Sequence, residues 1–316
     1  MSERPNLLLL GTASDRIRAR LDATFDVVAE TDLDAAMRHA DIEAVAMIGH
    51  WKLDGKAFDA WPKLKIISNF GVGYDTIDAA EAARRGILVS HTPDVLNQEV
   101  ADTTLMLWLA VSRQLLPSED WARSGAWVEN GNYPLTHSIR NRAVGIVGLG
   151  RIGLEIAELA KVFGARIMYH TRSEKPCDYQ YFPNLVEMAR EAEVLIVITP
   201  GGPATHHLIN AEVIDALGPE GILINVARGS VVDEAALTEA LVAGRLGGAG
   251  LDVFEEEPVI TDALKTLKNV VLLPHVGSGT IETRQAMGDL VCDNLDNWLK
   301  SGAVLKPVPE CKDLNG

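Results

Sequence analysis

The chain has 316 residues, of which 47% are hydrophobic and 23% charged, a length and composition that fit about two globular domains. Its formal charge of -15 argues against a nucleic-acid or anionic-membrane partner, so we expect a small-molecule ligand instead. The apolar runs are too short for a signal peptide or a membrane span, and the three widely spaced cysteines indicate free thiols. These features predict a cytoplasmic protein.

The first hundred residues alternate between short β-branched or leucine-rich runs and helix-length amphipathic segments, which is typical of a parallel sheet covered by helices. We expect strands at residues 6–10, 44–48, 65–69 and 87–90, with helices at 34–39 and 78–84. A proline stop and a capping aspartate at 92–94 precede a long apolar-periodic helix, predicted over 97–115, which would link this unit to a second one.

The same alternation continues in the second unit. The expected strands lie at residues 143–147, 165–169, 194–198, 222–226, 250–253 and 270–273. Six strands fit a dinucleotide-binding fold. The final helix, predicted over 281–299, has no further strand of that sheet to follow, and we expect it to return to the first domain.

A glycine fingerprint follows the first of these strands and opens a helix, which is the context that makes such a motif credible. The first glycine turns the chain, the second lets the backbone approach a pyrophosphate and the third permits close helix packing. We therefore expect cofactor contacts at Gly148, Gly150, Arg151, Ile152 and Gly153. The alternative is a tight strand-to-helix turn that is merely rich in glycine.

The end of the second strand of this unit distinguishes the two nicotinamide dinucleotides. An NAD site usually has a carboxylate there for the ribose hydroxyls, whereas the sequence reads Thr171-Arg172-Ser173. A guanidinium and two hydroxyls suit a 2′-phosphate, so we predict that these residues bind it and that NADP(H) is preferred over NAD(H). The alternative is a solvated turn with an incidental arginine.

Arg228 and His275 each follow a predicted strand, at the sheet edge where doubly wound folds bind ligands. A guanidinium can hold a substrate carboxylate in a bidentate fork, and a histidine can donate a proton. Glu257 would favour the charged imidazole if it lay beside His275; otherwise the acidic run 255–257 is a solvated loop. Five of the other histidines show no metal-ligand spacing, so we expect no metal site and take them as structural or surface residues: His50, His91, His137, His206 and His207.

With these residues in hand, the chain resembles the D-isomer-specific 2-hydroxyacid dehydrogenases, and within them the hydroxypyruvate and glyoxylate reductases. The resemblance covers nearly the whole length. The matching stretches are residues 69–75, 145–153, 225–230, 247–258 and 272–280.

The resemblance implies an α/β protein with two doubly wound parallel-sheet domains. A Rossmann domain that binds NADP, at 98–283, would be inserted in a flavodoxin-like substrate domain made of 1–97 and 284–316, and the protein would be a homodimer. The implied activity is the reduction of small 2-oxo acids, hydroxypyruvate and glyoxylate, to D-2-hydroxy acids by hydride transfer from NADPH.

The resemblance also implies residue roles. Arg228 would orient the substrate carboxylate and keto group, His275 would protonate the developing alkoxide, and Glu257 would hold that histidine charged. The backbone amides at Val72 and Gly73 would receive the substrate carboxylate. Further cofactor contacts are expected at Asp252, which would bind the nicotinamide carboxamide, and at Thr199, Pro200, Val226 and Gly277.

Two alternatives stay open. One is a D-2-hydroxyacid dehydrogenase for another 2-oxo acid such as pyruvate or phenylpyruvate, because no spacing rule reads the pocket that holds the substrate side chain. The other is a nucleotide-sensing binding protein, because transcriptional corepressors that resemble this family keep the same three residues. The acidic charge and the intact set of Arg228, Glu257 and His275 favour the enzyme.

Overall fold

The computed structural model describes residues 4–315, which form two compact units. One unit contains the described residues up to Leu96 and those from Thr280 on, and the other is Asn97–Gly279. The second boundary lies before the expected residue 284 because Thr280 caps the last helix: its hydroxyl accepts the N–H of Thr283 at 3.3 Å. A boundary at 284 would divide this helix, α13 (Ile281–Ser301), inside its first turns.

The first unit contains one parallel sheet with the strand order β2-β1-β3-β4-β5. This is the order of flavodoxin-like doubly wound folds. The sheet is apolar throughout its centre, as a parallel sheet covered on both faces must be. Its strands are β1 (Asn6–Gly11), β2 (Asp26–Glu30), β3 (Ala44–Ile48), β4 (Ile66–Asn69) and β5 (Leu88–Ser90). Its helices are α1 (Asp15–Thr24), α2 (Leu33–Ala36), α3 (Gly55–Ala60), α4 (Ala79–Arg84) and α13.

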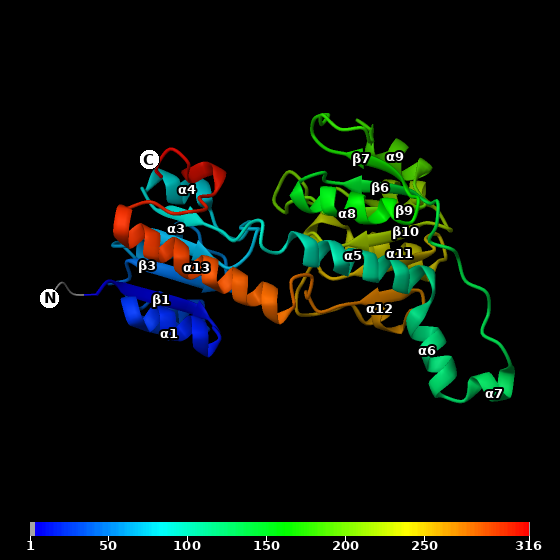
Figure 1. Cartoon of the computed structure of the whole chain (residues 1–316), viewed down its shortest axis with the longest axis horizontal. Helices are drawn as coiled ribbons and strands as arrows, with labels where there is room; N and C mark the ends of the chain where they lie inside the picture. Colours follow the sequence, from blue (N-terminus) through cyan, green and yellow to red (C-terminus); the bar gives the residue numbers. More distant parts are fainter. Residues whose placement is uncertain (1–3, 316) are drawn as a thin grey trace. The chain divides into compact units, whose positions relative to one another are not determined.

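The final helix belongs to this first unit, as expected from the sequence (Figure 1). Buried residues of α13, among them Val291 and Leu295, join the core of the sheet. The hydroxyl of Ser68 on β4 donates to the carbonyl of Val291 at 3.2 Å. The two ends of the chain therefore build one unit, and the second unit is inserted between them in the sequence.

The observed elements differ from the predicted ones in several places, and two of these differences have simple physical reasons. β2 was not predicted, because it is an edge strand whose residues are half-buried or exposed and so lacks the buried apolar run used as the signal. The long helix ends at Ser112 rather than at 115, because Gln114 adopts a left-handed backbone with φ of 48°.

The second unit contains a seven-stranded parallel sheet with the order β12-β11-β10-β9-β6-β7-β8. The prediction of six strands missed β8, a two-residue edge strand. The strands are β6 (Ala143–Val147), β7 (Arg166–His170), β8 (Gln180–Tyr181), β9 (Val194–Val197), β10 (Ile222–Asn225), β11 (Gly248–Leu251) and β12 (Val270–Leu272). The helices are α5 (Asn97–Ser112), α6 (Leu115–Arg123), α7 (Ala126–Asn130), α8 (Arg151–Lys161), α9 (Leu185–Glu191), α10 (Ala211–Leu217), α11 (Glu234–Val242) and α12 (Asp262–Thr266).

Helices cover both faces of this sheet. A Cβ on Gly250 of β11 would meet Leu107 of α5, whereas a Cβ on Gly145 of β6 would meet Met188 of α9. α5 and α8 therefore lie on one face, and α9 lies on the other with α10 and α11 (Figure 1). This is the layer arrangement of a doubly wound fold.

The register of the sheet sets the position of the functional segments. Six residues at the carboxyl ends of neighbouring strands are Cα partners in one row across the sheet: His170, Val147, Val197, Asn225, Leu251 and Leu272. Each segment of the second unit that the sequence singled out begins directly after this row. The parallel sheet thereby collects residues from distant parts of the chain at one edge, which is where doubly wound folds bind ligands.

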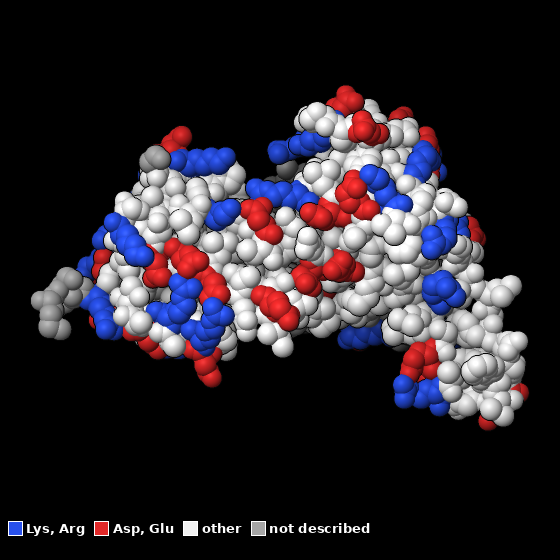
Figure 2. Space-filling model, in the orientation of Figure 1, with Lys and Arg blue, Asp and Glu red and all other residues white. Residues whose placement is uncertain are grey.

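The surface of the described residues carries charges of both signs (Figure 2). On the face drawn in Figure 2, acidic and basic side chains are interspersed. Some of the described charges form ion pairs, as Arg20 does with Asp293 at 2.8 Å. Within residues 4–315, none of the helices has the length and apolar character needed to cross a bilayer.

Candidate active site at the carboxyl edge of the larger sheet

The glycine fingerprint forms a tight strand-to-helix turn between β6 and α8. Gly148 has φ of +104°, and a Cβ there would lie 2.8 Å from the carbonyl oxygen of Ile198. A Cβ on Gly153 would lie 2.2 Å from the carbonyl oxygen of Gly148, so only glycine lets α8 pack this closely. Above Gly150, by contrast, a Cβ would meet no described atom within 4 Å.

This turn fits a dinucleotide pyrophosphate. Gly150 is the N-cap of α8 and supplies no side-chain hydrogen bond, so the cap leaves the first-turn amides of Ile152 and Gly153 to other acceptors such as an anion. Helix N-termini of this kind bind phosphate through backbone N–H groups and the helix dipole. The open space above Gly150 would let a pyrophosphate approach the backbone closely.

At the end of β7, the segment 171–173 forms an ordered turn. The hydroxyl of Thr171 donates to the carbonyl of Ser173 at 2.7 Å, and the hydroxyl of Tyr181 donates to the carbonyl of Thr171 at 3.2 Å. Arg172 and Ser173 are exposed at the tip of this turn. The turn therefore presents a guanidinium and a hydroxyl, while the Thr171 hydroxyl already donates inside it.

His275 and Glu257 form the pair that the sequence could only suggest. Nδ1 of His275 lies 2.7 Å from Oε2 of Glu257, with the two side chains 30% and 29% exposed. The other carboxylate oxygen of Glu257 accepts the N–H of Phe254 at 3.1 Å. Because one oxygen is held by the backbone, the other is directed at the imidazole.

Asp252 anchors the loop that carries His275. It is buried, and its two carboxylate oxygens accept the N–H groups of Val276 at 2.7 Å and Gly277 at 2.8 Å. Burial raises the pKa of Asp252, although these two hydrogen bonds oppose the shift. The N–H of His275 also donates to the carbonyl of Asp252 at 2.8 Å. Sequence reasoning missed this anchoring role, because it depends on the pairing of β11 with β12.

Arg228 is positioned by the residue that ends β10. The side-chain amide of Asn225 donates to the carbonyl of Arg228 at 3.0 Å, and its oxygen accepts the N–H of Ala227 at 3.1 Å. Nη1 of the half-buried Arg228 donates to the carbonyl of Ala227 at 2.8 Å. Arg228 thus follows β10 at the same edge at which Glu257 and His275 follow β11 and β12.

The remaining expected cofactor residues of this unit also lie at this edge. Thr199 and Pro200 follow β9, and the carbonyl of Pro200 accepts the hydroxyl of Thr205 at 2.7 Å. Val226 is buried and donates its N–H to the carbonyl of Val197 at 3.2 Å. A Cβ on Gly277 would lie 2.9 Å from Oδ2 of Asp252, so this position has no room for a side chain.

In the first unit, Val72 and Gly73 lie in the loop after β4, and two side chains hold the carbonyls of this loop. The amide nitrogen of the buried Asn69 donates to the carbonyls of Gly71 at 3.3 Å and Gly73 at 3.0 Å. Nδ1 of His91 donates to the carbonyl of Val72 at 2.9 Å. His91 therefore has a specific partner that its isolated place in the sequence did not reveal.

Comparison with known proteins assigns the chain to a protein family. The NAD-binding domain of the D-isomer specific 2-hydroxyacid dehydrogenases matches residues 105–277. The chain belongs to this family. The finding confirms the predicted family, the α/β fold with its Rossmann domain, and the enzyme class.

Named relatives are similar over most of their length. The enzyme is 48% identical to hydroxyphenylpyruvate reductase of Plectranthus scutellarioides over 86% of this chain and 87% of that protein. It is 46% identical to glyoxylate/hydroxypyruvate reductase A of Arabidopsis thaliana over 81% and 82%. The crystal structure of the NADPH-dependent glyoxylate/hydroxypyruvate reductase of Sinorhizobium meliloti, in complex with NADP and malonate, superposes with a TM-score of 0.93 at 48% identity, covering 98% of each chain.

Proposed function

We propose that the enzyme reduces small 2-oxo acids, hydroxypyruvate and glyoxylate in particular, to D-2-hydroxy acids with NADPH. The observation that carries this proposal is the 2.7 Å contact between His275 and Glu257 at the sheet edge that also holds Arg228 and the glycine turn. A proton donor, its supporting carboxylate and a carboxylate-binding cation are the groups that reduction of a 2-oxo acid requires.

Each of the three residues has a distinct task in this proposal. The guanidinium of Arg228 binds the substrate carboxylate and polarises the adjacent carbonyl. When bound, a reduced nicotinamide supplies the hydride that converts this carbonyl to an alkoxide. His275 gives its Nε2 proton to the alkoxide oxygen, because its Nδ1 is directed at Glu257. The Glu257 carboxylate stabilises the charged imidazole before that transfer.

Within the first unit, the loop after β4 is the proposed carboxylate-binding segment, through the backbone amides of Val72 and Gly73. The carbonyls of residues 71–73 are all taken by Asn69 and His91. Within residues 4–315, no protein oxygen accepts the N–H of Val72 or of Gly73. A loop with its carbonyls bound and its amides available suits an anion.

The preference for NADPH rests on the turn at 171–173. Exposed Arg172 and Ser173 suit a 2′-phosphate, and no carboxylate stands at the end of β7 to accept ribose hydroxyls. The Sinorhizobium relative is named as NADPH-dependent and was crystallised with NADP, which supports the same preference here.

Steady-state kinetics test the activity directly. We expect the absorbance of NADPH to fall rapidly with hydroxypyruvate or glyoxylate, and NADH to have the higher KM. Pyruvate, phenylpyruvate and hydroxyphenylpyruvate complete the panel, since the Plectranthus relative is named for the last of these. Faster turnover of the aromatic acids would replace the proposed substrate class. Tight NADPH binding without turnover of any of them would favour the sensing alternative.

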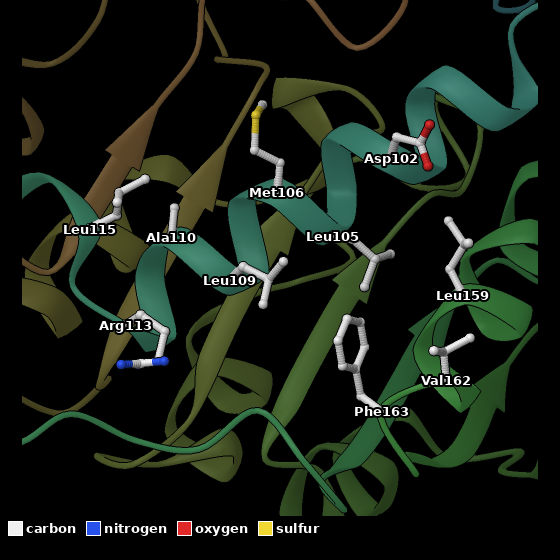
Figure 3. A pocket seen from close by; sticks show the side chains of 10 residues that line it. All are labelled: Asp102, Leu105, Met106, Leu109, Ala110, Arg113, Leu115, Leu159, Val162 and Phe163. Carbon is white, nitrogen blue, oxygen red and sulfur yellow. The ribbon is translucent and has the colours of Figure 1, made fainter.

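We also propose that the enzyme is a homodimer. Ten residues of the second unit line an open apolar groove of about 590 Å³ between α5, α8 and the start of α6, drawn in Figure 3: Asp102, Leu105, Met106, Leu109, Ala110, Arg113, Leu115, Leu159, Val162 and Phe163. α6 and α7 contain no buried residue, and Trp127 and Val128 of α7 are 61% and 92% exposed. In a two-fold dimer each copy's α6–α7 segment would cover the other's groove.

Sedimentation of a matched pair of variants tests the dimer. Met106→Glu places a charge in the groove, where the methionine is 48% exposed, and should yield monomers. Val242→Glu places the same charge on α11, at a residue that is 63% exposed and outside the groove, and should leave the dimer intact. A monomeric wild type, or a dimeric Met106→Glu, would contradict the proposal.

A cytoplasmic location is the last part of the proposal. Cys177, Cys292 and Cys311 are free thiols. Burial raises the pKa of Cys292 to about 11, which keeps this thiol in its unreactive form. Free thiols fit a reducing compartment, and fractionation of the native cells with an antibody to the enzyme would test this location.

A further inference from the structure

His207 lies between the two segments that carry Arg228 and Glu257, and it contacts both. Its backbone N–H donates to the carbonyl of Ser230 at 2.9 Å, two residues after Arg228. Its ring Nε2 lies 2.6 Å from Oε1 of Glu255, two residues before Glu257. One residue from the loop after β9 therefore joins the segments that follow β10 and β11.

These two segments already meet backbone to backbone. A Cβ on Gly229 would lie 1.9 Å from the carbonyl carbon of Phe254 and 2.3 Å from the nitrogen of Glu255. The carboxylate of Glu234 accepts the N–H of Glu255 at 3.0 Å and the hydroxyl of Thr261 at 2.6 Å, which holds the segment on both sides of Glu257. The contact of His207 with Glu255 is a third interaction that holds these two segments together.

The backbone of His207 is held in an unusual conformation. Its φ is +49°, in the left-handed region that non-glycine residues rarely adopt. Backbone bonds to the segment after Arg228 flank it, since Ile209 donates its N–H to Val231 at 3.0 Å. Such strain persists only where the surroundings impose it, and here it directs the ring toward Glu255.

The geometry of the neighbouring groups favours a hydrogen-bonded pair of His207 and Glu255 over a metal site. Ligand atoms of His206, His207 and Glu255 all lie within 4.8 Å of one another. However, the two imidazole rings stack with centroids 3.9 Å apart and planes inclined by 27°, so their in-plane lone pairs do not converge on one ion. Asp233 adds a second carboxylate 3.8 Å from Nδ1 of His207.

We propose that His207 is a positioning residue for the reaction: by binding Ser230 and Glu255 it fixes the spacing between Arg228 and the pair Glu257–His275. This inference rests on the roles proposed above for those three residues. His207 touches none of the reacting atoms in this scheme. Its effect is to keep the carboxylate-binding cation and the proton donor in one geometry, and small displacements of such groups are costly to the rate.

A set of variants separates positioning from mere stability. His207→Gly removes the ring and relieves the left-handed backbone, so we expect its Tm to stay within a few degrees of the wild type. We expect its kcat/KM for hydroxypyruvate to fall by about 10- to 100-fold. The alkaline decline of kcat/KM should move to lower pH, since Glu257 supports the charged imidazole less well. The Kd for NADPH should not change.

Three further variants make the result specific. His207→Gln keeps an N–H donor near the position of Nε2 and should recover most of the activity. Glu255→Ala should lose activity as His207→Gly does, and the double variant should lose no more than either single variant, because both act through one contact. His206→Ala removes the exposed stacking neighbour and should leave the pH profile of kcat/KM unchanged.

The outcomes distinguish this inference from the proposed function. An unimpaired His275→Gln variant, measured in the same series, would overturn the proposed catalytic roles themselves. An impaired His275→Gln together with a His207→Gly that keeps wild-type kcat, KM and pH profile would overturn the positioning role alone. Additive losses in the His207→Gly/Glu255→Ala double variant would also overturn it.

Discussion

Two loops of the molecule are fixed by side chains of opposite polarity. The loop after β12 in the second unit is held by Asp252, whose carboxylate accepts the N–H groups of Val276 and Gly277. The loop after β4 in the first unit is held by donors, Asn69 and His91, which bind its carbonyls. The acceptor Asp252 binds backbone amides of the loop after β12. The donors Asn69 and His91 bind only carbonyls and so leave the amides of the loop after β4 available.

This difference suits the proposed division of labour. In the loop after β12, the amides of Val276 and Gly277 are already hydrogen-bonded to Asp252. The group that this loop can offer a ligand is therefore a side chain, that of His275. The loop after β4 carries no ionisable side chain at residues 70–73 and offers backbone N–H groups instead. The polarity of the anchoring residue therefore decides what each loop can give a ligand: a proton from one, a neutral cradle for a carboxylate from the other.

The largest expected effect comes from the side chain of the loop after β12. His275→Gln keeps a polar group of similar size but cannot donate a proton of suitable acidity, so we expect kcat to fall by about 10²- to 10⁴-fold. The Kd for NADPH, measured by quenching of protein fluorescence, should stay near the wild-type value. A kcat within a few-fold of the wild type would show that the proton comes from another group.

Arg228→Lys tests the second side chain at the same edge. A lysine keeps the charge but loses the planar fork that binds a carboxylate through two parallel hydrogen bonds. We expect kcat/KM for hydroxypyruvate to fall by about 10²-fold, a loss close to that of one oriented transition-state donor. Full activity in the lysine variant would mean that the charge alone suffices and that the bidentate geometry is wrong.

Much of this edge could be predicted from the sequence, and the reason is local. The glycine turn and the strands that precede Arg228 and His275 each consist of one continuous stretch of sequence. Periodicity and composition within that stretch are therefore enough to locate them. The contact of Glu257 with His275 could only be posed as a condition, because the acidic run 255–257 is also what a solvated loop looks like. The pairing of β11 with β12 decides between the two.

The residues that hold these loops could not be predicted, and the reason is their distance along the chain. Asp252 acts on Val276, His91 acts on Val72, and His207 acts on both Ser230 and Glu255. Each pair is joined by the register of a parallel sheet rather than by spacing in the sequence. His91 and His207 were accordingly taken as structural or surface residues. The edge strands β2 and β8 were missed because they lack a buried apolar run.

A smaller effect is expected from the donors that hold the loop after β4. Asn69→Ala removes the donor to the carbonyl of Gly73 and one of the two donors to the carbonyl of Gly71, which also accepts the N–H of Thr92 at 2.9 Å, so the amides of Val72 and Gly73 are held less firmly in direction. We expect the KM for hydroxypyruvate to rise by about 10- to 30-fold, the cost of one or two misplaced hydrogen bonds to a charged group, with a smaller change in kcat. His91→Gln, which keeps a donor toward Val72, serves as the milder control. An unchanged KM would show that this loop does not bind the substrate.

The smallest expected effect is that of Arg172→Ala on the KM for NADPH, which tests the cofactor site separately from the two loops. Arg172 is exposed, so its hydrogen bond to a 2′-phosphate is screened by water, and we expect Arg172→Ala to raise the KM for NADPH by only about 5- to 10-fold. The KM for NADH should not change, because NADH has no phosphate at this position. The KM for hydroxypyruvate should not change either, so Asn69→Ala and Arg172→Ala should each raise the KM of one reactant alone. If Arg172→Ala raised the KM values for both dinucleotides equally, the turn at 171–173 would be shaping the adenosine site as a whole, and the phosphate would have to be recognised elsewhere.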